Sequence, residues 1–335
     1  MSPIRVAFTT LGCKVNQDET AGMQVLFAQA GFDLVDFNDQ ADVYIVNTCT
    51  VTHVGSRKSR QLLRQARRRN PASLVVAVGC YPQAAWQELD ELEEVDLIVG
   101  NSHKTELVPL VKSALTGSGQ RVQVEELTDF CDLPVAISSN RHRATLKIQE
   151  GCQRYCTYCI VPRARGKLRS MPQEKIMVKA QELIKAGYRE IVLTGINLTS
   201  YGREGQGVGS LATVIKSIAP QVNPARIRIS SVEPTDFTPE LIQAVQDNAN
   251  VCRDFHIPLQ SGSNAVLQRM GRQYSADEFL ALTDSLKAQF DLPSISTDII
   301  VGFPGERDTE YAETFDLVRA VGFSRLHVFR YSPRP

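Results

Sequence analysis

Three cysteines lie within eight residues in the segment Cys152-Gln153-Arg154-Tyr155-Cys156-Thr157-Tyr158-Cys159, which has the spacing CxxxCxxC. Iron–sulfur clusters are anchored by cysteine thiolates and normally take four of them. Three thiolates can therefore hold three irons of a cubane cluster and leave the fourth iron open to another ligand. Zinc is a weaker alternative, because it usually takes four ligands in CxxC-type pairs, and no fourth cysteine or paired histidine is near in the sequence.

A second set of three cysteines is spread over the first hundred residues. Cys13, Cys49 and Cys80 each follow a segment that we predict to be a β-strand. Ligands of open α/β sheets bind at the carboxyl ends of the strands, so these thiols can converge although they are far apart in sequence. The alternative for each alone is a buried small hydrophobe. Cys131 and Cys252 have no metal-like partner, and we expect them to be structural.

The composition is that of an ordinary globular protein. The chain has 335 residues, 43% hydrophobic and 22% charged, and 37 basic residues balance 37 acidic ones. At roughly 150 residues per domain this length suggests two domains. No signal-peptide pattern is present, and no apolar stretch reaches the ~18 residues of a membrane span, so we expect a cytoplasmic protein without membrane contact. Eight cysteines in a reducing compartment favour metal binding or catalysis over disulfides.

The elements that must position these cysteines form two α/β units. Strand-like and helix-like segments alternate over the first 116 residues, which predicts a doubly wound parallel sheet. Residues 117–140 have weak periodicity and are expected to be a linker. Over residues 141–335 six strands alternate with helical or loop segments, too few for a complete eight-stranded barrel, so we expect an open, partial (βα)6 barrel. The predicted strands cover residues 5–9, 43–46, 74–78, 97–99, 145–149, 190–194, 227–231, 254–257, 296–301 and 325–329.

One segment carries a run of positive charge. Residues 56–69 contain seven arginines or lysines and no acidic residue, and Arg57, Arg60, Arg64 and Arg67 follow helical spacing. A charged run is usually a solvated helix face, but one sign without compensation is also typical of a phosphate-binding surface. A second basic cluster, with Arg163, Arg165, Lys167 and Arg169, follows the CxxxCxxC segment. We expect both to contact RNA.

Longer blocks of the sequence resemble the radical S-adenosylmethionine methylthiotransferase family. They cover nearly the whole chain and include TLGCKVNQ around Cys13, NTCTVT around Cys49, VGCYPQ around Cys80, LKIQEGC before the CxxxCxxC segment, IVPRARG after it, LTGIN at 193–197, HIPLQSGS at 256–263 and DIIVGFPGE at 298–306. GCKVNQ is similar to the branch that acts on N6-threonylcarbamoyladenosine beside the tRNA anticodon. The isopentenyladenosine branch resembles GCQMN, and the branch that modifies a ribosomal-protein aspartate resembles GCPKN.

The resemblance implies two [4Fe-4S] clusters with divided labour. The one on Cys152, Cys156 and Cys159 would cleave S-adenosylmethionine to a radical that attacks carbon 2 of the adenine. The one on Cys13, Cys49 and Cys80 would carry the sulfur that a second S-adenosylmethionine methylates. Tyr155 and Tyr158 lie within the CxxxCxxC segment. The candidates for holding S-adenosylmethionine are four polar residues at predicted strand ends: Asn197, Glu233, Gln260 and Asp298. The alternative is that these residues cap helices or brace the barrel rim.

The same resemblance implies the partners. They are tRNA, a flavodoxin- or ferredoxin-like electron donor and a sulfur donor. Family members continue into a small C-terminal RNA-binding β-barrel of the TRAM type, which we expect to be absent from these 335 residues. Two alternatives are methylthiolation of another target, either isopentenyladenosine in tRNA or a ribosomal-protein aspartate, and a non-catalytic two-cluster redox protein. The redox protein is the weaker one, because an electron carrier would need four protein ligands per cluster.

Overall fold

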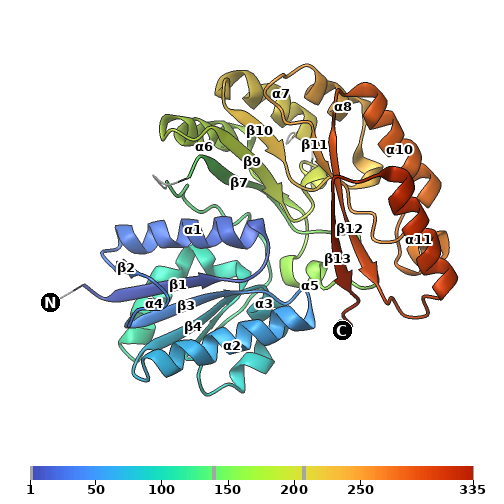
Figure 1. The fold of residues 1–335 in the computed structure, drawn as a ribbon. Coiled ribbons are helices and arrows are strands. Elements are labelled where there is room, and N and C mark those ends of the chain that lie inside the picture. The colour runs from blue at the N-terminus through green and yellow to red at the C-terminus, as the bar shows by residue number, and fades with distance from the viewer. Residues whose placement is uncertain (1–2, 138–140, 206–208, 335) are drawn as a thin grey trace.

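The computed structural model describes residues 3–137, 141–205 and 209–334. Its first part is a six-stranded parallel sheet in the order β2-β1-β3-β4-β5-β6 (Figure 1). The central strands are runs of β-branched and apolar residues buried on both faces, as a covered parallel sheet requires. The strands are β1 (Arg5–Thr10), β2 (Asp33–Val35), β3 (Val43–Thr48), β4 (Leu74–Gly79), β5 (Leu97–Val99) and β6 (Val122–Gln123).

Helices cover both faces of this sheet, so the predicted doubly wound arrangement is confirmed. Met23 and Phe27 of α1 pack with residues of α4 on one face, and Leu63 of α2 packs with Tyr81 and Leu89 of α3 on the other. The helices are α1 (Lys14–Gln29), α2 (His53–Arg69), α3 (Cys80–Asp90), η1 (Asn101–Glu106) and α4 (Leu107–Leu115).

The second part is an open barrel of six parallel strands. Strands β7, β9 and β10 pair side by side, and β11, β12 and β13 pair in the same way. Isolated bridges, Ile227 with Val251 and Ser231 with His256, join β10 to β11 and complete the arc. The six predicted barrel strands are thus confirmed. They are β7 (Arg143–Glu150), β9 (Glu190–Gly195), β10 (Arg226–Ile229), β11 (Asp254–His256), β12 (Ser294–Val301) and β13 (Arg325–Arg330).

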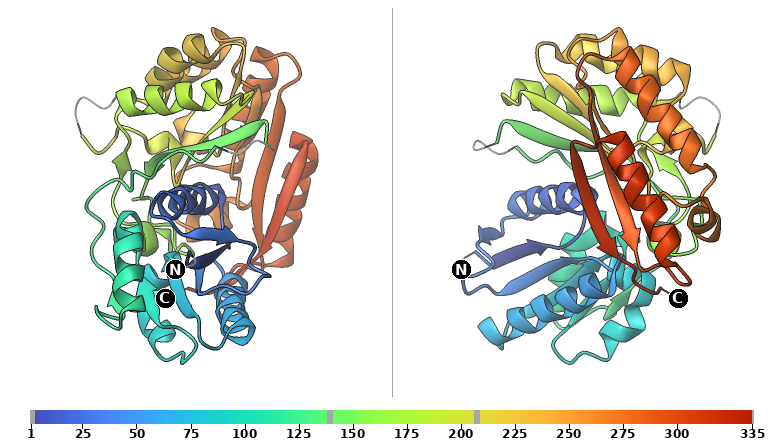
Figure 2. Two further views of the ribbon diagram at one scale, coloured as in Figure 1. Left: turned by 90° about the vertical axis from the view of Figure 1, so that its left-hand side faces the viewer. Right: turned by 45° about the vertical axis from the view of Figure 1, so that its right-hand side comes forward.

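Helices pack on the outer side of the barrel strands around one large apolar core. Figure 2 shows that the concave side of the arc turns toward the first sheet, so that the carboxyl ends of both sheets approach one another. The remaining elements are α5 (Val161–Arg165), β8 (Arg169–Ser170), α6 (Gln173–Lys185), η2 (Leu198–Ser200), α7 (Leu211–Val222), η3 (Pro234–Asp236), α8 (Pro239–Gln246), α9 (Asn264–Arg269), α10 (Ala276–Gln289) and α11 (Asp308–Val321).

Three short strands were not predicted. Strand β6 lies inside the segment expected to be linker and pairs with β5 through two residues. Strand β8 runs antiparallel to β7 and pairs with its last two residues. Strand β2 adds a third edge segment beside β1. Each has two or three residues, too few for any periodic pattern, and is held in place by its neighbour.

Candidate active site

The loop that carries Cys152, Cys156 and Cys159 starts at the carboxyl end of β7. Gly151 has φ +77°, and a Cβ there would lie 1.8 Å from the carbonyl oxygen of Lys167, so only glycine allows the turn. Backbone hydrogen bonds then fix the loop. The N–H of Cys152 donates to the Gly166 carbonyl at 3.1 Å, and the N–H of Thr157 donates to the Met270 carbonyl at 3.1 Å.

The three thiols of this loop are close enough to affect each other's ionisation. Burial, with smaller contributions from charge on Cys156 and Cys152, raises the pKa of the Cys159 thiol to about 12. Polar hydrogens point at the sulfurs: Arg272 Nη1 lies 3.5 Å from Cys156 Sγ and Asn197 Nδ2 lies 3.9 Å from Cys152 Sγ. Three converging free thiols with N–H donors are the donor set that an iron–sulfur cluster with one open iron requires.

Two of the four predicted S-adenosylmethionine contacts lie beside this loop. The Asn197 amide faces Cys152, as described above. Glu233 accepts from Arg272 Nη2 at 2.5 Å, so Arg272 connects Glu233 to Cys156. Gln260 has φ +66° and joins β11 to β12, because its carbonyl accepts from the Ile300 N–H at 2.8 Å and its own N–H donates to the Asp298 carbonyl.

Asp298, the fourth predicted contact, lies inside strand β12 and pairs with two histidines. His256 Nε2 is 3.1 Å from one carboxylate oxygen, and His327 Nδ1 is 3.2 Å from the other. The three residues come from neighbouring parallel strands: His327 is the register partner of Asp298, and His256 is that of Ser296, two positions earlier on β12. Both histidines were missed by the sequence analysis. The available signal was that residues at alternating positions of a barrel strand face the same side.

Cys13, Cys49 and Cys80 converge as predicted for strand ends. Cys13 is exposed at the start of α1, Cys49 is partly buried after β3, and Cys80 is buried at the start of α3. The Asn16 side-chain oxygen lies 3.8 Å from Cys13 Sγ and 3.9 Å from Cys80 Sγ. Burial raises the pKa of the Cys49 thiol to about 11, with further contributions from charge on Cys80 and Cys13. This donor set also fits a cluster with one open iron.

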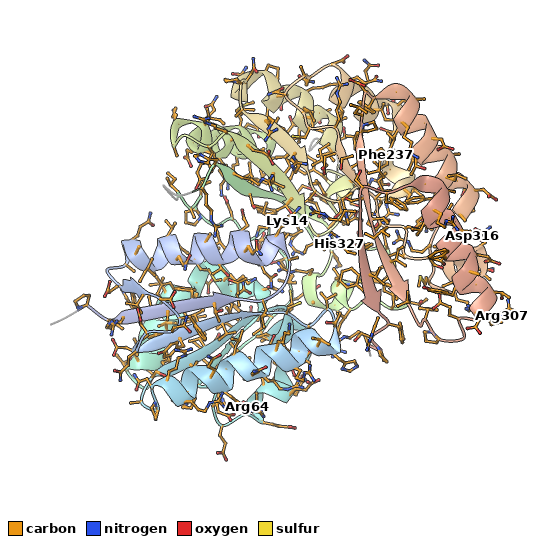
Figure 3. The ribbon with its side chains drawn as sticks, in the orientation of Figure 1. Lys14, Arg64, Phe237, Arg307, Asp316 and His327 are labelled. Carbon is orange, nitrogen blue, oxygen red and sulfur yellow. The ribbon has the colours of Figure 1, made fainter. Side chains whose placement is uncertain are left out.

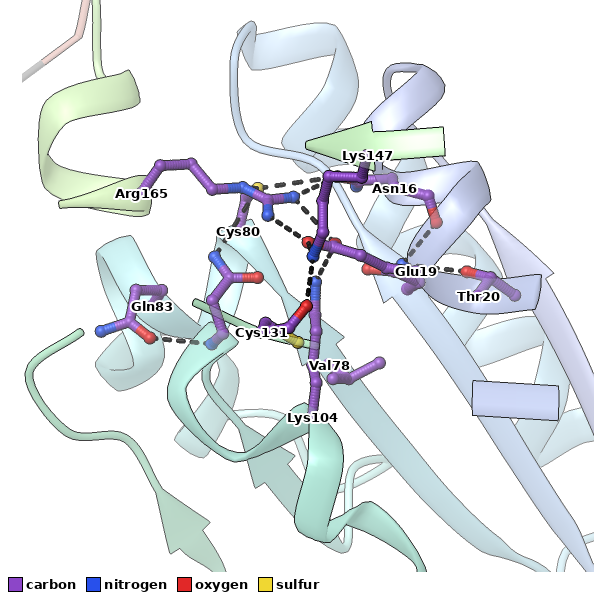
Figure 4. Close-up of polar contacts among 12 residues, drawn as sticks. Asn16, Glu19, Thr20, Val78, Cys80, Gln83, Lys104, Cys131, Lys147 and Arg165 are labelled. Atoms are coloured by element: carbon purple, nitrogen blue, oxygen red, sulfur yellow. Dashed lines mark hydrogen bonds and ion pairs between the residues drawn. The ribbon is translucent and has the colours of Figure 1, made fainter. Parts of the chain in front are cut away.

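A buried group of charged residues lies directly beside Cys80 (Figure 4). Glu19 of α1 is fully buried, and its carboxylate pairs with Lys104, with Lys147 Nζ at 3.1 Å and with Arg165 Nη1 at 2.5 Å. Burial opposes its ionisation, but these three cations hold the pKa of Glu19 well below its usual range. Lys147 and Arg165 come from the barrel part of the chain, so the network joins the two parts.

The expectation that Arg165 contacts RNA phosphates is wrong, because its side chain is 2% exposed. The second basic cluster splits by direction: Arg163 and Lys167 are exposed, whereas Arg165 and Arg169 point inward, where Arg169 pairs with Glu150. Their regular two-residue spacing gave no sign of this division.

The basic stripe on α2 is compensated in space although not in sequence. Arg60 pairs with Glu88, Arg64 with Glu94 at 3.4 Å and Arg67 with Asp96 at 2.6 Å. Figure 3 places Arg64 at the edge of the first part, away from the barrel. Arg57 is exposed and has no ion-pair partner within the described ranges, so of the four stripe residues it is the best placed to bind phosphate.

Comparisons with known proteins agree with this geometry. Residues 146–318 match the Radical SAM superfamily, and residues 5–100 match a family described as Uncharacterized protein family UPF0004. A threonylcarbamoyladenosine tRNA methylthiotransferase of Aquifex aeolicus is 40% identical, over 99% of this chain and 81% of its own length. A tRNA-2-methylthio-N(6)-dimethylallyladenosine synthase of Thermotoga petrophila is 36% identical, over 99% of this chain and 75% of its own.

The chain belongs to the radical S-adenosylmethionine methylthiotransferase family. Members of this superfamily use S-adenosylmethionine and a [4Fe-4S] cluster, and the membership argues against a non-catalytic redox protein. Among solved structures, the radical S-adenosylmethionine methyltransferase TsrM from Kitasatospora setae shares the fold with TM-score 0.71, at 14% identity over 99% of this chain and 77% of its own. No helix in the described ranges combines the length and apolarity needed to cross a bilayer.

Proposed function

We propose that this chain adds a methylthio group to carbon 2 of N6-threonylcarbamoyladenosine in tRNA, using two [4Fe-4S] clusters and two molecules of S-adenosylmethionine per turnover. The observation that carries the proposal is the grouping of six free thiols into two separate sets of three. Each set lies at the carboxyl ends of parallel strands, where ligands bind. Because a cubane cluster normally takes four thiolates, each set leaves one iron open, and two open irons match radical formation and sulfur transfer.

The residues around the barrel cysteines suit the positioning of a cofactor. The cluster and S-adenosylmethionine would supply the radical chemistry when bound, and the protein would position them. The Asn197 side-chain N–H points toward the Cys152 sulfur. Glu233 is hydrogen-bonded to Arg272, which also contacts the Cys156 sulfur. We infer that these two side chains hold polar groups of S-adenosylmethionine. Gln260 follows β11 and Asp298 lies in β12, toward the end of the arc away from β7. We infer that Asp298 with its two histidines contacts the nucleoside.

The N-terminal cysteines differ in accessibility in a way that suits sulfur transfer. Cys13 is exposed and Cys80 is buried against Arg165 and Asn16. An incoming sulfur species and the target base would therefore approach from the side of Cys13. We propose residues 1–116 as the sulfur-carrying unit, 117–140 as the connection and 141–335 as the radical-generating unit, with a sulfur donor and a flavodoxin- or ferredoxin-like electron donor as partners.

The nucleoside assignment is supported by the relatives and by Lys14 and Val15. Relatives from Aquifex aeolicus and Bacillus subtilis, each 40% identical, are named for threonylcarbamoyladenosine, whereas the Thermotoga petrophila relative named for dimethylallyladenosine is 36% identical. The Lys-Val pair after Cys13 resembles the first branch. Isopentenyladenosine in tRNA is the second candidate, and it is an outcome of the same assay.

The proposal is tested by anaerobic reconstitution with iron and sulfide, followed by incubation with reductant, S-adenosylmethionine and tRNA that carries either N6-threonylcarbamoyladenosine or isopentenyladenosine. We expect 5′-deoxyadenosine and the methylthio product only with the first tRNA, measured by mass spectrometry of nucleosides. Product from the second tRNA alone would contradict the nucleoside assignment. Absence of deoxyadenosine with both would contradict the radical mechanism.

Two cysteine variants test the division of labour. The triple alanine variant of Cys152, Cys156 and Cys159 and that of Cys13, Cys49 and Cys80 should each lose about half of the bound iron, because three of six thiolates are removed. Only the first should lose reductive cleavage of S-adenosylmethionine. A single-alanine variant at Cys252, which lies outside both sets, is the control and should keep full iron content. Full iron in either triple variant would contradict the two-cluster assignment.

A further inference from the structure

Arg165 is a buried arginine that reaches from the barrel part of the chain to a cysteine of the first part. It ends α5, the short helix that follows the Cys152–Cys159 loop, and only six positions separate it from Cys159. Its Nε lies 3.2 Å from Cys80 Sγ. Arg165 therefore connects the two cysteine sets. Its backbone lies six positions after Cys159, and its guanidinium N–H contacts the sulfur of Cys80.

The other guanidinium nitrogens are fixed as well. Nη2 donates to the Asn16 side-chain oxygen at 2.6 Å and lies 3.1 Å from Glu19 Oε2, while Nη1 donates to Glu19 Oε1 at 2.5 Å. Asn16 also faces the sulfurs of Cys13 and Cys80. A planar fork held at three points has little freedom to turn, so its Nε–H is directed at the Cys80 sulfur.

The number of charges indicates that Arg165 does more than neutralise the Glu19 carboxylate. Glu19 keeps two other partners, Lys104 and Lys147, when Arg165 is removed. The residues joined by these ion pairs carry four cations, Lys104, Lys147, Arg165 and Arg169, against the two carboxylates of Glu19 and Glu150. Asp18 also lies near Lys147, but burial raises its pKa to about 7, so it offsets this charge only in part. The surplus is positive and lies next to Cys80, where thiolate ligands add negative charge.

We propose that Arg165 is a positioning residue that sets the reduction potential of the N-terminal cysteine site by donating a charge-assisted hydrogen bond to the Cys80 sulfur. The inference rests on the part of the proposed function that assigns a cluster to Cys13, Cys49 and Cys80. Hydrogen bonds to cluster sulfurs and nearby positive charge favour the reduced state, which carries one more negative charge. The radical-generating half of the enzyme thus supplies the group that tunes the sulfur-carrying half.

The test uses the full chain with Cys152, Cys156 and Cys159 changed to alanine, so that only the N-terminal site holds iron. The reconstituted protein is titrated with dithionite and oxidant while EPR and visible absorption are recorded. Arg165→Gln should lower the midpoint potential by at least 59 mV, which corresponds to a tenfold change in the one-electron equilibrium constant. Arg165→Lys keeps the charge without the directed Nε–H and should give a smaller shift of the same sign.

Arg169→Gln is the matched control. Arg169 is also a buried arginine of the same segment and pairs with Glu150, but it has no sulfur contact among the described residues. It should lower the melting temperature and shift the potential by much less than Arg165→Gln does, because it removes a nearby positive charge but no N–H to sulfur contact. Equal shifts in Arg165→Gln and Arg169→Gln, or an Arg165→Lys variant that loads iron at the parent potential, would overturn the role of Arg165. A parent that binds no iron would overturn the N-terminal cluster itself and the inference with it.

Discussion

Glu19 shows at the scale of one residue how a buried charge is maintained. A carboxylate without solvent is strongly disfavoured unless cations and hydrogen bonds replace its hydration. Here Lys104, Lys147 and Arg165 do so from three different segments. The arrangement favours the ionised form of Glu19, because protonation of the carboxylate would leave three buried cations without the negative charge that they share.

Replacement of Glu19 by glutamine should therefore destabilise the protein in a pH-dependent way. Removing one partner of a buried ion pair costs about 3–5 kcal/mol. Since the pKa of Glu19 is lowered in the folded state, its contribution is complete above the unfolded value of about 4.5 and is lost as the pH falls below it. The free energies of urea unfolding of Glu19→Gln and parent should thus differ by the full amount from pH 7 down to about 4.5, and the difference should shrink only as the pH falls below that value. Glu240→Gln, at an exposed helix start, is the control, and a pH-independent difference would contradict the argument.

The residues of the candidate site divide into those that the sequence predicts and those that it does not. The positions of the two sets of three cysteines at strand ends were predictable, because local spacing and the ends of apolar strands locate them. Lys104 and Lys147 were not, because they meet Glu19 across 85 and 128 positions. Arg272 likewise reaches Cys156 across 116 positions. Such pairs leave no periodic signal, and only the folded chain brings them together.

At the scale of elements, the turns after β4 and β7 place the cysteines, and both depend on glycine. Gly79 has φ +108°, and a Cβ there would lie 2.4 Å from the Asn47 side-chain oxygen. Gly151 is tighter still, with backbone of Lys167 at 1.8 Å. The helices and strands themselves were predictable from apolar runs. The edge strands β6 and β8 were not, because backbone pairing rather than side-chain pattern creates them.

Gly151→Ala should disrupt the barrel cysteine site. The added methyl group would collide with backbone that cannot rotate away, so the loop must shift. We expect loss of most of the iron bound by Cys152, Cys156 and Cys159, measured in a variant that lacks the N-terminal cysteines. Gly187→Ala is a matched control, because Gly187 has φ +90° but no atom within 4 Å of the added Cβ. It should cost only the left-handed strain of about 1–2 kcal/mol and keep its iron. Equal iron content in both variants would contradict this account.

At the scale of the whole molecule, the two sheets present their carboxyl ends to a common region and are joined by the Glu19 network. Exposed cations near that region are better placed for RNA than those at its far edge. Arg57 and Lys58 lie in the first turns of α2, eight and nine positions after Cys49, and neither has an ion-pair partner within the described ranges. Arg64 and Arg67 lie farther along the helix and are paired.

Charge reversal at the two ends of α2 should therefore have different effects. Arg57→Glu with Lys58→Glu should weaken tRNA binding and reduce the slope of log affinity against log salt by about 1 for each lost phosphate contact. Arg64→Glu with Arg67→Glu should leave that slope unchanged and lower the melting temperature, because the new carboxylate at position 67 would face the carboxylate of Asp96. Binding is measured by filter retention over a salt series on the reconstituted protein. If the second pair alone changes the slope, phosphates bind along the far stripe and the surface near Cys49 is not the RNA contact.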